Sequence, residues 1–354
     1  MKLLDMKCDV VTPLFLYGAN QNIAELRAPA FKGAIRYWWR AINADLNIKS
    51  LREKENKIFG GVSENEEDKA SKSKISLHIA NDLKDSDKET DLKKEISDLN
   101  PNYGNHQGIS YLLYSVTSMR KRPYIKAGSG FHINVRIEDD SSMDEFLRAL
   151  TAFEYFGALG SRARRGAGSV SIEIDDELPM PYKEFFNYDN INNKEDLKHR
   201  IEQIGKMIPK SIHKDYSVLK GSTVYIFDGC TKWIDALEKI GKPFKEFRHK
   251  KESNIFETPY FGIPIYHKSK RSLFIAENTN NKERINRRAS SLIFKILKCS
   301  DEKYFPMLIH LNGDFLPQGF KITNGDTNEQ SDSNDNIIYE FLKSISNDSL
   351  EAKL

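Results

Sequence analysis

Three arginines within four residues, set among glycines, are the side chains in this sequence best suited to binding phosphate. Residues 157–170 carry glycine at 157, 160, 166 and 168 and arginine at 162, 164 and 165. Glycine lets the main chain adopt positive φ angles and approach a partner closely. Arginine presents a planar, permanently charged fork that fits phosphate. We therefore predict an anion site formed by Gly160, Arg162, Arg164, Arg165 and Gly166.

The order of elements around this loop differs from that of a mononucleotide-binding loop. Such a loop follows a strand, contains Gly-x-x-x-x-Gly-Lys-Ser/Thr and opens a helix. Here helical periodicity precedes the loop and a β-type run, 169–174, follows it. That order favours binding to the phosphates of a polymer over binding to a mononucleotide. A solvated basic hairpin without a ligand is the alternative.

A second set of cations lies on a helix predicted over 30–46, with Pro29 placed for its first turn. Lys32, Arg36 and Arg40 recur at every fourth residue and so share one face. That face either binds phosphate or is simply solvated. An apolar stripe lies beside it, and we expect its two tryptophans to pack in the core rather than stack on bases. The stripe consists of Ile35, Trp38, Trp39, Ile42 and Leu46.

Catalytic groups are sparse. The eight histidines show no metal-ligand spacing, and three distant cysteines predict reduced structural thiols, so we expect no metal and no cofactor. Metal-independent RNA cleavage would need a base for the 2′-hydroxyl proton and a cation for the phosphorane. His106 and His132, both near glycines, are the candidates. We predict a protein without catalytic activity and keep a metal-independent endoribonuclease as the alternative.

Length and composition predict a globular protein of two domains. The chain has 354 residues, of which 39% are hydrophobic and 30% charged, and its net charge is +3. No apolar run approaches the roughly 18 residues of a membrane span, which predicts a cytoplasmic protein without membrane contact. Acidic residues gather in 64–68 and 82–95. The nearly neutral net charge is therefore compatible with a basic surface elsewhere on the protein.

The predicted elements indicate an α+β fold, and their order in the first half is compatible with a ferredoxin-like (RRM-like) domain. In residues 1–178 we expect strands over 7–16, 75–79, 108–117, 131–137 and 169–174. The helices are 30–46 and 143–159, the second opened by a capping box of Ser142 and Glu145. Polar inserts up to about residue 100 are expected to be loops. In such a β-α-β-β-α-β unit the sheet face or its rim can hold single-stranded RNA.

A second, degraded unit is predicted over residues 179–354, after Pro179 and Pro181. We expect strands over 223–227, 290–297 and 304–311, the last two paired, and helices over 232–240 and 336–345. Residues 187–198 are expected to form an insert or an exposed helix.

Several motifs together resemble the RAMP superfamily of CRISPR proteins. They are residues 12–18 and 25–40, ending in Trp38-Trp39-Arg40, then Ile58-Phe59-Gly60 and residues 157–166, all in the family's order. The resemblance covers about residues 7–175. It is strongest to the first subunits of the type III-B (Cmr) effector complex. Residues 287–293 resemble a C-terminal block of that family, with Ser291 where proline is commoner.

The resemblance implies two ferredoxin-like domains and a non-catalytic subunit of an RNA-guided complex in antiviral defence. Its partners would be guide (CRISPR) RNA, target single-stranded RNA and other Cmr-type RAMP subunits. It would lie near the 3′ end of the guide, with cleavage in a neighbouring subunit. The resemblance also implies one alternative, a RAMP-type endoribonuclease that processes guide RNA without a metal. A scaffold that contacts only protein is the other alternative. The predicted RNA-binding residues are Arg27, Lys32, Arg36, Arg40, Lys121, Arg122, Gly160, Arg162, Arg164, Arg165 and Gly166.

Overall fold

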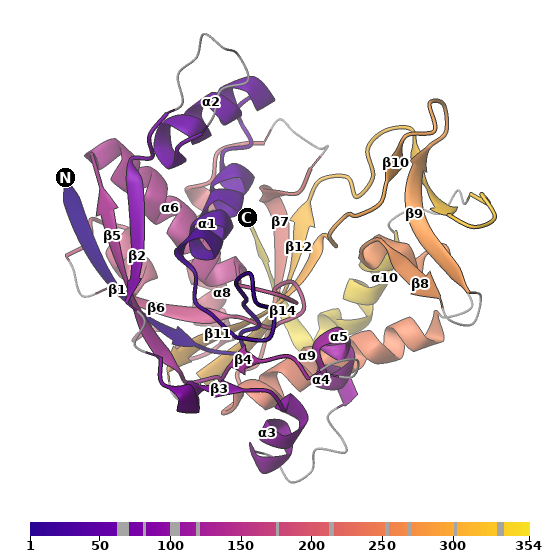
Figure 1. Cartoon of the computed structure of the whole chain (residues 1–354), viewed down its shortest axis with the longest axis horizontal. Helices are drawn as coiled ribbons and strands as arrows, with labels where there is room; N and C mark the ends of the chain where they lie inside the picture. The colour runs from indigo at the N-terminus through magenta and orange to yellow at the C-terminus, as the bar shows by residue number, and fades with distance from the viewer. Residues whose placement is uncertain are drawn as a thin grey trace.

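The protein has a mixed α/β fold built on antiparallel sheets. The computed structural model describes residues 1–61, 71–80, 83–99, 107–117, 121–174, 177–211, 216–251, 255–267, 271–300, 303–330 and 336–354. Two of its four-stranded sheets alternate with two layers of helices. From left to right in Figure 1, the layers are the first sheet, the first helices, the second sheet and the second helices.

The first sheet has the strand order β2-β5-β1-β6. Its strands are β1 (Lys2–Val10), β2 (Ile75–Ala80), β5 (Gly130–Ile137) and β6 (Val170–Ile174). Side chains along β1 and β5 alternate between exposed and buried, as expected for a sheet with one covered face. Helices α1 (Ala28–Ile42) and α6 (Asp140–Phe156) cover the inner face. The predicted helices and the strands at 75–79, 131–137 and 169–174 are therefore confirmed within a few residues.

The second sheet repeats this plan in the order β11-β12-β7-β14. Its strands are β7 (Val218–Phe227), β11 (Leu292–Ser300), β12 (Lys303–Asn312) and β14 (Ser349–Lys353). One face, which includes Met307, packs with α1, α6 and α8 (Lys194–Lys206). The other, which includes Leu308, packs with α9 (Trp233–Lys250) and α10 (Asn336–Ile345). The predicted pairing of residues 290–297 with 304–311 is confirmed. One cluster of buried side chains includes residues from both sheets, so the two halves share a continuous core.

The strand predicted over residues 108–117 is wrong, because this segment forms α4 (Gln107–Leu112) and α5 (Tyr114–Thr117). The Glu238 carboxylate on α9 accepts hydrogen bonds from the N–H groups of Gly108 and Ile109, at 3.0 and 2.9 Å. A Cβ atom on Gly108 would lie 2.2 Å from the Lys242 nitrogen. Packing against α9 therefore overrides the β propensity of the segment.

The prediction that the polar insert up to residue 100 is a loop is wrong for residues 83–99. They include η1 (Asp85–Asp87), β3 (Lys88–Glu89), which pairs with β4 (Tyr124–Ile125), and α3 (Leu92–Leu99). Leu92 and Ile96 on α3 are buried. The acidic run at 64–68 lies outside the described residues.

Some element ends also differ from prediction. β1 begins at Lys2 and stops at Val10, and α1 stops at Ile42. Helix α6 is capped by Asp139, which accepts a hydrogen bond from the Ser142 nitrogen at 2.8 Å, so the predicted capping box is wrong. Helix α9 extends past residue 240 to Lys250. The remaining short elements are α7 (Tyr182–Phe185), η3 (Thr258–Phe261) and η4 (Ser346–Asp348), and α2 (Ile48–Phe59) is an unpredicted helix.

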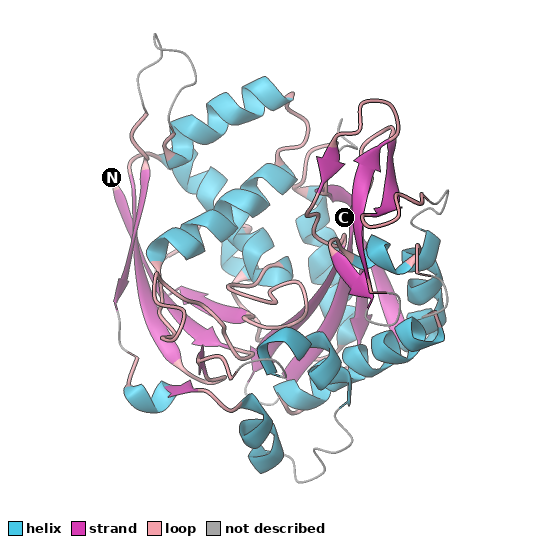
Figure 2. Cartoon of the chain, turned by 45° about the vertical axis from the view of Figure 1, so that its right-hand side comes forward, coloured by secondary structure: helices cyan, strands magenta, loops and turns pink. Residues whose placement is uncertain are grey.

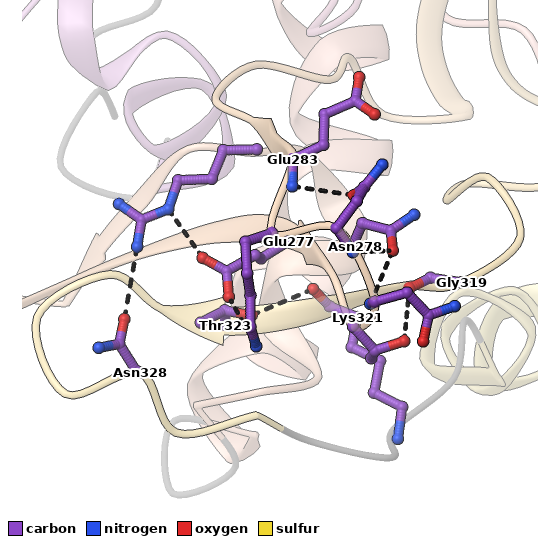
Figure 3. Close-up of polar contacts among 12 residues, drawn as sticks. Glu277, Asn278, Glu283, Gly319, Lys321, Thr323 and Asn328 are labelled. Carbon is purple, nitrogen blue, oxygen red and sulfur yellow. Dashed lines mark hydrogen bonds and ion pairs between the residues drawn. The ribbon is translucent and has the colours of Figure 1, made fainter.

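A small third sheet projects from the second half and comes forward in Figure 2. It is formed by β8 (Ile265–His267), β9 (Ser272–Asn278), β10 (Arg284–Ile285) and β13 (Phe320–Asn324). The Glu277 carboxylate on β9 accepts a hydrogen bond from Arg284 Nε at 2.8 Å, and Figure 3 shows this contact. The same bond lowers the pKa of Glu277. It holds β10 against β9 and so fixes the start of the chain that leads to β11.

Candidate nucleic-acid interface

The glycine-rich loop after α6 lies between the two halves of the chain. The Ser161 nitrogen donates to the Phe15 carbonyl at 2.8 Å, and the Phe294 nitrogen on β11 donates to the Arg164 carbonyl at 3.1 Å. Gly160 has a φ of 76°, and a Cβ atom there would lie 2.4 Å from the Phe15 oxygen. Gly166, with a φ of 85°, approaches Leu237 closely. The glycines therefore allow close approach to the protein's own chain, which is a different use from the ligand contact predicted.

Arg165 is held inside this junction. Its Nη2 donates to the Phe261 carbonyl at 2.7 Å, and its guanidinium lies 5.1 and 5.4 Å from the ring centres of Phe244 and Phe294. Burial, with a contribution from nearby Arg248, lowers the pKa of Arg165 to about 9. Its Nη1 is buried and has no hydrogen-bond partner among the described residues. This position argues against direct phosphate contact by Arg165 and makes it a link between the halves.

Arg162 and Arg164 are half-buried and keep part of their surface open. Arg162 has a φ of 62° and donates through Nε to the Ser115 hydroxyl at 2.7 Å. Neither of its terminal nitrogens has a hydrogen-bond acceptor among the described residues, so both can donate to a phosphate. Arg164 donates to the Ser290 carbonyl at 2.5 Å and to the Tyr37 hydroxyl at 2.7 Å. Arg162 is therefore the loop arginine best placed for an external anion.

The cationic row on α1 mainly binds neighbouring elements. Lys32 Nζ donates to the Ser73 hydroxyl at 2.7 Å and to the Ile75 carbonyl at 3.0 Å. Arg36 Nε and Arg40 Nη1 both donate to the buried Glu55 carboxylate on α2, at 2.7 and 2.6 Å. The row thus fastens α2 and β2 to α1. Within the row, the Arg40 side chain, 41% exposed, also reaches an open cavity.

The two tryptophans on α1 pack in the core, as predicted. Trp39 is 0% and Trp38 3% exposed. Trp39 Nε1 donates to the Glu145 carboxylate at 2.7 Å. This contact joins α1 to α6 without any ligand, and it uses the glutamate that the sequence suggested for a helix cap.

Arg122 lies next to the segment on which the glycine loop rests. Its Nη1 donates to Gln21 Oε1 at 3.0 Å, and its guanidinium lies 5.8 Å from the Tyr17 ring centre. Phe15 pairs with Ser161, the residue before Arg162, so Arg122 and the start of the loop turn both contact residues 15–17. We call this area, defined by Tyr17, Arg122, Ser161 and Arg162, the junction patch.

The other two predicted cations lie in more exposed settings. Arg27 is the N-cap residue of α1 and is 4.0 Å from the Glu25 carboxylate. Lys121 forms an ion pair with Asp91 at 2.7 Å, which raises the pKa of Lys121 and balances its charge. Arg27 therefore adds to the accessible positive charge more than Lys121 does.

Sequence reasoning missed a cavity on the other side of the loop. Arg40 and Arg164 line it together with Tyr37, Arg287 and Arg288. The sequence signal for it was the C-terminal block over residues 287–293, which stood out for its family resemblance and not for its charge.

The groups considered for catalysis do not assemble into a site in the described part of the chain. His132 is exposed on the outer face of the first sheet, opposite Lys7 on β1. His106 lies outside the described residues. Within the described ranges, no three His, Cys, Asp or Glu side chains group in a way that could hold a metal ion. No helix in those ranges has both the length and the apolar character needed to span a membrane.

Residues 7–171 match the family model of the RAMP superfamily. This match confirms the resemblance found in the motifs of that part of the chain. The chain is similar to two proteins of Pyrococcus furiosus, the CRISPR system Cmr subunits Cmr1-1 and Cmr1-2. The first is 26% identical over 318 residues, or 84% of each chain. The second is 26% identical over 186 residues, or 48% of this chain and 95% of that one.

Solved structures show the same fold. The crystal structure of Cmr1 from Pyrococcus furiosus in its apo form matches with a TM-score of 0.64 and 20% identity, over 100% of this chain and 99% of that chain. A chain of the type III-B Cmr-beta complex bound to cognate target RNA matches with a TM-score of 0.57 and 15% identity, over 98% and 99%.

Proposed function

We propose that this chain is a non-catalytic, RNA-binding subunit of a type III-B CRISPR effector complex. It contacts guide RNA and target single-stranded RNA, near the 3′ end of the guide, and assembles with other Cmr-type RAMP subunits in the cytoplasm. The similarity to Cmr1 supports the assignment to this complex. The similarity to a chain of Cmr-beta bound to cognate target RNA supports RNA as the ligand.

The observation that carries RNA binding is the junction patch. Arg122 lies against Tyr17, and Arg162 follows Ser161, which pairs with Phe15. The terminal nitrogens of Arg162 have no acceptor among the described residues. Arginine forks bind phosphate oxygens strongly and need no particular base sequence. A surface of this kind suits a guide and a target whose sequences vary.

The two repeated β-α-β-β-α-β orders support two ferredoxin-like domains, divided near residues 178 and 179. In each half, the first strand lies between the third and the fourth in the sheet. The outer face of the first sheet carries polar residues where an RRM would carry aromatic ones. We therefore place RNA on the junction between the domains and not on that sheet face.

Photocrosslinking tests this proposal directly. The purified chain is irradiated with single-stranded RNA containing 4-thiouridine, and the crosslinked peptides are identified by mass spectrometry. We expect crosslinks in residues 13–27, 121–125 and 157–169. A pure scaffold predicts no crosslinks, and crosslinks confined to the outer faces of β1 and β5 would move the RNA to the first sheet.

A further inference from the structure

A pocket of about 520 Å³ opens where α1 and α2 meet the segment between β10 and β11. Its wall includes Tyr37, Ile48 and Leu51, and its rim includes Arg40, Arg164 and Arg287. Four of the described lining residues are arginines and none is acidic. We call it the arginine-rimmed pocket. Its volume falls in the range of small-molecule sites, roughly 300–1,000 Å³.

The wall of this pocket offers apolar surface to a flat ligand. Ile48 is 62% exposed although it is a large aliphatic residue, while Leu51 beside it is 6% exposed. The Tyr37 ring is held in place by Arg164, which donates to its hydroxyl. Exposed apolar surface framed by polar groups is typical of a binding site.

The rim supplies positive charge that the protein does not fully neutralise. Arg287 is exposed and has no hydrogen bond or ion pair with any described residue. Arg40 shares Glu55 with Arg36, so two guanidinium groups face one carboxylate. A ligand with an apolar, planar part and an anionic part fits both the wall and the rim.

The pocket is also preformed. The Arg288 nitrogen and the Ile263 carbonyl pair at 3.0 Å, and Arg288 Nη2 donates to the Asp314 carbonyl at 2.8 Å. The bond between Glu277 and Arg284 fixes β10 just before this segment (Figure 3). The wall that carries Arg287 is therefore anchored at both ends, which reduces the ordering cost of binding.

We propose that the arginine-rimmed pocket takes one unstacked nucleotide of the bound RNA. The base lies against Tyr37, Ile48 and Leu51, and the adjoining phosphates lie at Arg40 and Arg287. This proposal rests on the RNA-binding function proposed above. Unstacked bases of single-stranded RNA commonly pack on aromatic and arginine surfaces. The pocket adds a base-dependent, sequence-tolerant contact to the phosphate contacts of the junction patch.

The test compares two RNA oligomers of equal length, oligouridine and the same ribose-phosphate chain without bases. Dissociation constants are measured at one salt concentration for the wild-type protein and for Ala289→Trp, which fills the pocket from its lining. We expect the wild type to prefer oligouridine by on the order of tenfold, the value for one stacked base. In Ala289→Trp the ratio of the two affinities should fall to near one.

A second pair of variants keeps the test independent of the tryptophan. Ile48→Asp places an acid on the pocket wall, and Leu3→Asp makes the same change at a site 63% exposed on β1 that is not part of the pocket lining. Ile48→Asp should lose the preference for oligouridine, and Leu3→Asp should keep it. An unchanged preference in both Ala289→Trp and Ile48→Asp overturns the pocket proposal and leaves the proposed function standing. Failure of the wild type to bind either oligomer overturns both.

Discussion

Arg164 and Tyr37 are joined in two ways beside the junction between the halves. Arg164 Nη2 donates to the Tyr37 hydroxyl at 2.7 Å, and the guanidinium carbon lies 5.3 Å from the ring centre. The same guanidinium donates to the Ser290 carbonyl just before β11. One side chain of the glycine loop thus ties α1 of the first half to the sheet of the second.

Replacement of Arg164 by alanine should weaken this junction. The variant lacks two hydrogen bonds from a charged donor, and the Ser290 carbonyl keeps no partner from the loop. We expect the free energy of unfolding, measured by urea denaturation, to fall by about 1–3 kcal/mol. Tyr37→Phe keeps the ring and removes only the hydroxyl, so it should lower the free energy of unfolding by less than Arg164→Ala does. Equal stability of Arg164→Ala and the wild type would show that the contact contributes nothing to the junction.

Trp39→Ala should destabilise the protein far more than a surface change. Trp39 is fully buried and binds Glu145, so its removal leaves a cavity and an unpartnered carboxylate oxygen. The expected loss of stability is about 3–5 kcal/mol. Met180→Ala, at a site 62% exposed, serves as the control and should change stability by under about 0.5 kcal/mol. A stable Trp39→Ala variant that no longer binds RNA would instead make Trp39 a base-stacking residue.

A buried acid and a buried base between α6 and β11 should give the protein a characteristic dependence on pH. Glu154 and Lys295 are both 0% exposed. Tyr188 donates to Glu154 at 2.8 Å, and Lys295 donates to the Gly157 carbonyl at 2.8 Å. Burial raises the pKa of Glu154 from 4.5 to about 7 and lowers the pKa of Lys295 from 10.5 to about 8.

The signs of the two effects are opposite. Between pH 4.5 and 7 the folded chain keeps a proton on Glu154 that the unfolded chain releases, so the free energy of unfolding falls as pH rises. Between pH 8 and 10.5 the folded chain has lost the Lys295 proton that the unfolded chain keeps, so the free energy of unfolding rises with pH.

The double variant Glu154→Gln with Lys295→Met removes both groups. Its stability relative to the wild type should be highest near pH 7–8 and lower at about pH 5 and about pH 10, because the ionised pair costs most at neutral pH. Urea denaturation at the three pH values measures this. A stability difference that does not vary with pH would contradict the two pKa shifts.

Local patterns predicted most of the first half but few of its long-range contacts. The alternation along 131–137 and the helical stripe around Trp39 each follow from one period and one covered face. The helix at Gln107–Leu112 was missed because its start depends on Glu238, far along the chain. A glycine beside apolar residues gives no local sign of such a partner.

In the candidate site, too, local patterns were predicted correctly and long-range contacts were not. Charge and glycine spacing located the loop at 157–170 correctly as a special segment. They did not reveal that Arg165 turns inward onto Phe244, or that Arg36 and Arg40 share Glu55 of an unpredicted helix. An arginine on a helix face has the same pattern in sequence whether its partner is a phosphate or a carboxylate. The identity of the partner depends on tertiary structure.

The isolated chain should leave single-stranded RNA intact, with or without divalent metal. His132 lies on the outer face of the first sheet, and the cation opposite it, Lys7, forms an ion pair with Glu173 at 3.0 Å. Lys7 is therefore already balanced by a carboxylate and is a weak candidate for stabilising a phosphorane beside that histidine. Gel analysis of end-labelled RNA measures this. Cleavage that persists through purification and disappears in His106→Ala or His132→Ala would establish the guide-processing alternative.

The most direct test of RNA binding at the junction patch is the salt dependence of affinity in a matched pair of double variants. Arg122→Ala with Arg162→Ala removes two charges from the patch. Lys93→Ala with Arg136→Ala removes two exposed charges elsewhere. Fluorescence anisotropy with labelled single-stranded RNA gives the slope of log affinity against log salt. We expect the patch variant to bind more weakly and its slope to be shallower by about 0.7 for each phosphate that it no longer neutralises. The control should match the wild type. A folded patch variant with unchanged affinity and slope would contradict the account.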